Sequence, residues 1–286
     1  MVRKAVVAGS FYEDSFDALD KQINDCFKSK FGPGELPISK REKDILGVIS
    51  PHAGYQFSGM GAAWAYKEIA ESKFPDLFIM LGLSHSGFGN CVSLEEWETP
   101  FGIVENDKAF GKRLMENGGL KQDEAAHSDE HSIEVQLPFL QFVNKDRLRL
   151  LRIVPVIVSS GYEEVAQAIV KTIKDTGKKA MIIASSDFTH YGLNYGFFPF
   201  SDNIKENMYK LDNGAIEHIK KLNAYRFLSY TDETGATICG RMPIAAALEA
   251  CKLLGAKKAR LLRYYTSGDV IGDYGSAVGY GAISIE

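Results

Sequence analysis

The chain has 286 residues, 45% of them hydrophobic and 24% charged, with a formal net charge of −4. This length accommodates one large α/β domain or two small ones, and the lack of a concentrated basic patch argues against nucleic acid as a partner. No apolar run approaches the roughly 20 residues that cross a bilayer, and the N-terminal residues lack the apolar core of a signal peptide, so we expect a cytoplasmic protein without a membrane partner.

Apolar residues of the first half of the chain follow two different patterns. Spacings of three and four residues indicate helices, and short continuous apolar runs bounded by turn residues indicate buried strands. In chain order, the predicted elements are a helix at 15–31, a strand at 45–50, a helix at 56–74, a strand at 77–83, an antiparallel hairpin at 91–104 and a helix at 107–117.

The second half continues the alternation. Residues 127–143 carry a helical pattern interrupted by Pro138, where we expect a kink or a break. The elements predicted after it are a strand at 148–158, a helix at 162–176, a strand at 179–185, helices near 201–213 and 214–222, a helix at 244–254 and strands between 260 and 285. This order predicts one α/β domain, residues 1–286, with a mostly parallel central sheet flanked by helices.

Three histidines each come after a different predicted buried strand. They are His52 after 45–50, His85 after 77–83 and His190 after 179–185. Ligands of open α/β sheets bind beyond the carboxyl ends of the strands, so these imidazoles meet in one crevice if the strands are neighbours. Cys239 is a candidate fourth member, because it comes just before the helix predicted at 244–254 and a helix N-terminus favours the thiolate.

This set of side chains indicates a metal site. Imidazole nitrogens suit zinc, iron, copper and nickel, and two histidines plus one anionic ligand are the pattern of non-haem iron(II) centres. A histidine outside the ligand set is suited to acid/base catalysis, because its ordinary pKa lies near neutrality. Asp187, three residues before His190, is a candidate to orient that histidine or to support a metal ligand.

Several nearby side chains have both a structural and a functional interpretation. His131 lies at an expected helix start, and we favour a structural or cleft-lining role for it over metal binding. Glu130 and Glu134 either face the positive end of that helix or line the cleft. Arg241 either binds an anionic substrate or forms a salt bridge, and Tyr55 is a candidate for an aromatic wall of the cleft.

Six motifs carry a resemblance to a known family. In order, they are AVVAGSFYE (5–13), SPHAGYQFSG (50–59), LGLSHSG (81–87), DEHSIEVQLPFL (129–140), SSDFTHYG (185–192) and TICGRMPI (237–244). The sequence resembles the Memo family, the B component of the AmmeMemoRadiSam system. That family is similar in fold to the catalytic subunit of class III extradiol ring-cleavage dioxygenases, so the resemblance implies an extradiol-dioxygenase-like fold for this chain.

The resemblance also implies roles for individual residues. It makes His52 and His85 metal-binding histidines, Cys239 a third ligand and His190 the acid/base residue, with Asp187 beside it. The implied cofactor is iron(II) or copper, with zinc as a further candidate. A cysteine in place of the dioxygenases' carboxylate favours copper or zinc, and it leaves the ring-cleavage reaction itself open.

The function expected from these residues is metal-dependent, dioxygenase-like redox chemistry on an unidentified small molecule or peptide. The resemblance further implies a functional association with a radical-SAM protein. Two alternatives stay open. One is a non-catalytic module that recognises a peptide or a small anion near Arg241, and the other is a zinc hydrolase with His190 or a glutamate as base.

Overall fold

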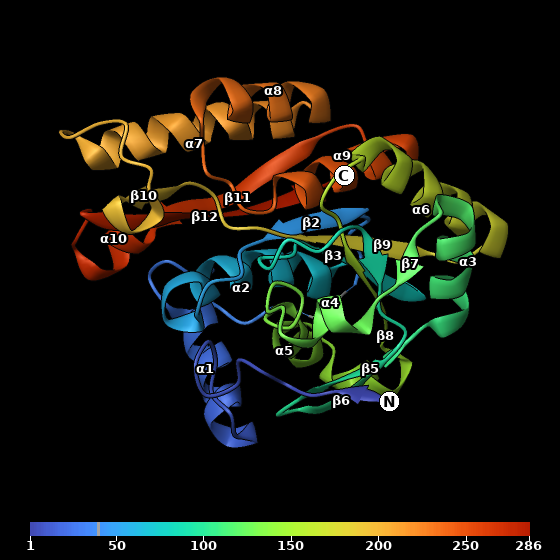
Figure 1. Cartoon of the computed structure of the whole chain (residues 1–286). Coiled ribbons are helices and arrows are strands. Elements are labelled where there is room, and N and C mark those ends of the chain that lie inside the picture. Colours follow the sequence, from blue (N-terminus) through green and yellow to red (C-terminus); the bar gives the residue numbers. More distant parts are fainter. Residues whose placement is uncertain (39–40) are drawn as a thin grey trace.

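The computed structural model of the chain describes residues 1–38 and 41–286, and a mixed β-sheet runs through its centre (Figure 1). Its strands, in chain order, are β1 Val2–Arg3, β2 Gly47–Ser50, β3 Leu77–Gly82, β4 Cys91–Val92, β5 Glu96–Thr99, β6 Gly102–Asn106, β7 Lys121–Gln122, β8 Arg152–Ile157, β9 Ala180–Ser185, β10 His190–Gly192, β11 Ala259–Thr266 and β12 Ser276–Ile285.

Helices cover both faces of this sheet, as the alternating sequence pattern predicts. They are α1 Phe16–Lys28, α2 Tyr55–Glu71, α3 Lys108–Gly118, α4 Glu124–Ser128, α5 Gln136–Val143, α6 Tyr162–Thr176, α7 Ile204–Lys220, α8 Ala224–Thr234, α9 Arg241–Leu253 and α10 Ser267–Ile271, with 3-10 segments η1 Lys145–Leu150 and η2 Leu193–Tyr195. In Figure 1, α7 and α8 lie on one side of the sheet and α1, α2 and α5 on the other.

The central strands are parallel. The neighbour order β6-β8-β3-β9-β2 consists of parallel pairs, and β12 adds antiparallel pairs to β2, β10 and β11. Alternate strand residues enter different cores: Ile79 packs in the core that contains α6 and α9, and Met80 packs in the core that contains α2 and α5. The fold prediction of an α/β structure with a mostly parallel, two-faced sheet is confirmed.

The adjacency of three strands decides where the site forms. Strand β9 lies between β2 and β3, with Ser50 opposite Ser185 and Leu81 opposite Ala184. The three chain segments that follow these strands therefore leave the sheet side by side at one edge. This is the arrangement that the expected convergence of His52, His85 and His190 requires.

The structure differs from the sequence prediction where a proline or a glycine was misinterpreted. The helix expected across 127–143 is interrupted well before Pro138, which instead lies in the first turn of α5, where a missing N–H costs little. The helices expected at 201–213 and 214–222 are the single helix α7, because Gly214 makes room for the Tyr230 ring of α8 and does not end a helix. Helix α8 itself was not predicted.

Strand β8 is shorter than expected, since η1 occupies Lys145–Leu150. Helix α9 begins at Arg241, three residues before the predicted start, with Pro243 in its first turn. Along the described residues, we find no helix both long and apolar enough to cross a bilayer.

Candidate metal centre

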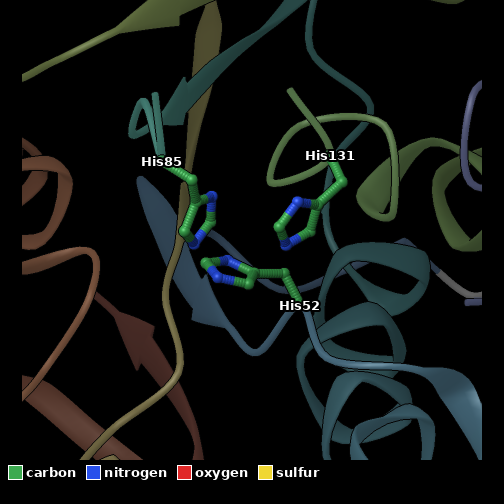
Figure 2. Close-up of side chains that lie close together, drawn as sticks. All are labelled: His52, His85 and His131. Atoms are coloured by element: carbon green, nitrogen blue, oxygen red, sulfur yellow. The ribbon is translucent and has the colours of Figure 1, made fainter. Parts of the chain in front are cut away.

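Three imidazoles meet at the edge of the sheet where β2 and β3 end. One ring nitrogen from each of His52, His85 and His131 lies within 4.8 Å of the others. Figure 2 shows the rings facing a common point, with His52 after β2, His85 after β3 and His131 on the turn between α4 and α5. The ring centroids of His85 and His131 are 4.4 Å apart, and that of His52 is 5.7 and 5.6 Å from them.

The hydrogen bonds of His52 fix its tautomer. Its Nδ1 lies 2.9 Å from the hydroxyl of Ser185, whose only hydrogen is donated to the Ser132 carbonyl at 2.6 Å. The hydroxyl must therefore accept from Nδ1–H, which leaves a lone pair on Nε2 of His52. Burial, followed by the charges of His131 and His85, lowers the pKa of His52 well below its usual value, so the ring is neutral and ready to bind a metal ion.

The carboxylate of Glu130 fixes the tautomer of His85. One carboxylate oxygen lies 3.0 Å from Nδ1 of His85, and the other accepts the backbone N–H of His85 at 2.7 Å. Burial alone would raise the pKa of Glu130, but hydrogen bonds from His85 and Ser132 lower it to about 2. The carboxylate is therefore ionised and accepts from Nδ1–H, which leaves Nε2 of His85 free, as in the carboxylate–histidine pairs of metal sites.

A cavity of about 320 Å³ opens on the cluster. Its polar lining includes the three histidines, Asp187 and His190, and its apolar lining includes Phe11, Phe57, Tyr195, Val278 and Tyr280. Burial, followed by the charge of His85, lowers the pKa of His131 to about 4. The cavity is thus lined by clustered imidazoles, and this donor set fits a divalent transition metal.

His190 lines the same cavity without joining the cluster. Its Nδ1 lies 3.1 Å from the carbonyl oxygen of Thr237, which can only accept, so Nδ1 carries the hydrogen and Nε2 is free to take a proton. The backbone N–H of His190 donates to the Thr237 hydroxyl at 2.9 Å. This geometry is that of a general base candidate held by Thr237.

Comparison with known proteins identifies the family. A sequence model of the family described as Memo-like protein matches residues 3–284. The chain belongs to the Memo-like family. It is 42% identical to a MEMO1 family protein of Nitrosopumilus maritimus, with 99% of each chain covered. It is 40% identical to a MEMO1 family protein of Methanothermobacter thermautotrophicus, over 99% of this chain and 100% of the relative.

A solved structure shares the fold. An uncharacterized protein of Escherichia coli K12 superposes with a TM-score of 0.54 at 14% identity, over 85% of this chain and 100% of that chain. At this identity the likeness shows the fold alone. The family expected from the six sequence motifs is confirmed, and the roles of the site residues rest on their geometry in the Memo-like chain itself.

Of the two roles open to Asp187, the structure favours support of a cluster residue over orientation of His190. Its carboxylate accepts the backbone N–H of His52 at 2.8 Å, whereas the imidazole of His190 is held by Thr237. Burial raises the pKa of Asp187, and the charge of His190 opposes that rise. In this Memo-like structure, Asp187 therefore supports the backbone of a cluster residue and contributes the one carboxylate among the described residues of the cavity lining.

Cys239 lies beside the cluster. Its Sγ is 3.2 Å from Nε2 of His52 and accepts the backbone N–H of Asp187 at 3.3 Å. Burial, followed by the charge of Asp187, raises the pKa of the Cys239 thiol, and this opposes the thiolate that we expected from the helix N-terminus. His131 occupies the third position of the cluster, which the sequence had suggested for Cys239.

Arg241 lies outside the lining of the histidine cavity. It pairs with Asp232 and, like Cys239, lines a second cavity of about 230 Å³. A salt bridge was one of the two roles open to it. Among the described residues that line the histidine cavity, Arg241 does not occur.

Two further residues expected to line the cleft are buried beneath it. The Tyr55 ring packs on Phe139, and its hydroxyl donates to the Val135 carbonyl at 2.7 Å. Glu134 is fully buried and pairs with Arg3. In the described residues, neither Tyr55 nor Glu134 lines the histidine cavity, whereas His131 lines it as expected.

Replacing Glu130 by glutamine tests the carboxylate's role at the centre. Glu130→Gln keeps the volume but loses the charge that orients Nδ1–H of His85, so we expect metal affinity to fall about 10–100-fold. Titration with Co(II), followed by its visible absorption, measures the change. Glu124→Gln is the control, because Glu124 bonds Ser93 and Leu94 and lies outside the cluster. Equal affinity in Glu130→Gln and wild type would contradict the assignment.

Proposed function

We propose that this Memo-like protein binds one divalent transition-metal ion through His52, His85 and His131 and carries out metal-dependent redox chemistry in the adjoining cavity. The observation that carries the proposal is the set of three ring nitrogens within 4.8 Å of one another, two of them with tautomers fixed by hydrogen bonds at Nδ1. Imidazole donors suit iron(II) and copper. When bound, such an ion supplies a redox couple and a Lewis acid.

The chain's own residues have separate roles in this proposal. His190 takes or returns a proton at Nε2, because its Nδ1–H is held by the Thr237 carbonyl. Phe11, Phe57 and Tyr195 form aromatic walls of the cavity that a bound substrate would contact. Cys239 is a candidate additional ligand, since its sulfur lies 3.2 Å from Nε2 of His52.

Anaerobic reconstitution tests the proposal. The protein is loaded with iron(II) or copper, desalted and assayed for metal content, and oxygen uptake is then measured with ascorbate as the electron donor. We expect about one ion per chain and metal-dependent oxygen uptake. His190→Ala should lower the uptake and leave the metal content unchanged. Protein that retains no metal, or oxygen uptake that is the same without metal, would exclude the proposal.

A second candidate function follows from the ligand set. Three histidines are also the ligands of catalytic zinc sites that activate water, and His190 would then serve as the base. The same reconstitution separates the two functions, because hydrolysis of a panel of esters and amides would require zinc and proceed without oxygen. The non-catalytic alternative predicts no turnover with any metal and an anion bound beside Arg241.

A further inference from the structure

A single arginine of the edge strand β1 contacts the turn that carries His131. Arg3 is 6% exposed, and its guanidinium bonds one residue of α4 and two residues of the segment between α4 and α5. Nε donates to the His127 carbonyl at 2.9 Å, a terminal nitrogen donates to the Glu130 carbonyl at 2.8 Å, and the other terminal nitrogen pairs with the Glu134 carboxylate. The Trp97 ring of β5 covers the guanidinium at 4.3 Å.

The bonded segment lacks the support that the other two ligands have. His52 and His85 directly follow strands paired on both sides, whereas His131 lies on a turn. The backbone of that turn is closed by bonds such as the one from Val135 N–H to the His131 carbonyl at 3.0 Å. The position of His131 therefore depends on contacts from outside the turn, namely those of Arg3 on one side and those of Ser132 with Leu83 and Ser185 on the other.

Glu134 extends these contacts to the cavity wall. Its carboxylate accepts the N–H groups of Val6 and Val7 at 3.0 Å and the hydroxyl of Tyr12 at 2.7 Å. These bonds hold the N-terminal segment that places the Phe11 ring 4.7 Å from the ring of His131. One buried ion pair thus links β1, the His131 turn and an aromatic residue of the cavity.

We infer that Arg3 is a positioning residue of the metal centre, acting through the backbone that carries His131. The inference rests on the proposed function, because it presupposes that the histidine cluster binds metal. A planar guanidinium with several donors can bond two carbonyls and a carboxylate at once, which an apolar side chain cannot do. Without it, the backbone on the N-terminal side of His131 loses two carbonyl bonds and Glu134 loses its ion pair.

Metal titration of the full-length protein tests the inference. Arg3→Met should bind Co(II) about 10–100-fold more weakly than wild type, with an altered visible spectrum, because the loss acts on ligand placement. Arg41→Met is the matched control. The Arg41 side chain is 8% exposed and pairs with Asp146, beyond the end of α5, so its loss should leave the Co(II) affinity unchanged. Unchanged affinity and spectrum in Arg3→Met would overturn the inference.

A double variant separates positioning from a general loss of stability. In a His131→Ala background, Arg3→Met should weaken Co(II) binding by much less than it does in the wild type, because the ligand through which it acts is gone. An equal loss in both backgrounds would overturn the inference. If Arg3→Met does not fold, Arg3→Lys carries the same test, since an ammonium can pair with Glu134 without bonding both carbonyls, and several-fold weaker binding is expected.

The two proposals fail in different ways. If the wild-type protein binds no Co(II), the proposed function fails and the inference fails with it. If the wild type binds Co(II) and Arg3→Met binds it equally well, only the inference fails. Circular dichroism and thermal unfolding of each variant show whether a change in affinity accompanies a change in fold.

Discussion

Removal of the imidazoles of both His52 and His85 is expected to abolish stoichiometric metal binding. The double variant His52→Ala/His85→Ala leaves His131 as the sole member of the cluster, and one neutral imidazole does not hold a divalent ion against dilution. The measurement is metal content per chain after anaerobic loading and desalting. Wild type should retain about one ion and the double variant essentially none.

The matched control for this experiment is His218→Ala. His218 lies on α7 and packs against Tyr230 of α8, with ring centroids 5.6 Å apart. Its replacement removes a histidine from the protein without touching the cluster, so metal content should equal that of wild type. A double variant that retains a full equivalent of metal would show that the ion binds elsewhere.

Acid is expected to destabilise the metal-free protein through His127. This side chain is fully buried beside Trp97, and burial lowers its pKa from the ordinary 6.5 to about 4. As pH falls, the unfolded chain therefore takes up this proton first. The stability that is present above pH 6.5 is lost between pH 6.5 and about 4, and a shift of this size corresponds to about 3 kcal/mol.

Urea unfolding at pH 7 and pH 4 measures this effect. The difference in unfolding free energy between the two pH values should be smaller by about 3 kcal/mol in His127→Gln than in wild type, because glutamine does not titrate. His218→Gln is the control for the loss of a histidine, since that side chain is only partly buried. An unchanged pH dependence in His127→Gln would mean that other groups cause the acid loss.

The sequence predicted the strands and the place of the site because both depend on local patterns. Apolar runs that end in turn residues indicated β2, β3 and β9, and the three histidines after them were visible in the chain. The adjacency of these strands then brought two of the histidines into the cluster and the third to the cavity wall. The motifs added the family, which the family model confirms.

The role of His131 was harder to predict, because a helical spacing of apolar residues runs through a turn. The pattern in 127–143 suggested one kinked helix, in which His131 would lie at the start. The observed break before α5 turns its imidazole toward His85. Pro138 was the available signal, since proline is favoured in the first turn of a helix and thus places the helix start just before it.

The surroundings of Glu134 and Cys239 could not be predicted, because they depend on contacts between residues far apart in the sequence. The partner of Glu134 is Arg3, 131 residues earlier, and no periodicity links the two. Cys239 precedes a helix, as predicted, but burial beside Asp187 outweighs the helix dipole and keeps the thiol protonated. Such contacts between distant segments become visible only when the chain is folded.

The hydroxyl of Ser185 has a consequence for how the site takes up an ion. Its one hydrogen goes to the Ser132 carbonyl, so it can only accept from His52, and Nε2 of His52 carries a lone pair and no hydrogen before any ion arrives. Burial lowers the pKa of both His52 and His131, so neither ring carries a second proton near neutral pH. Near neutral pH, uptake of an ion therefore releases no proton from either ring, and proton competition for these ligands begins only in acid.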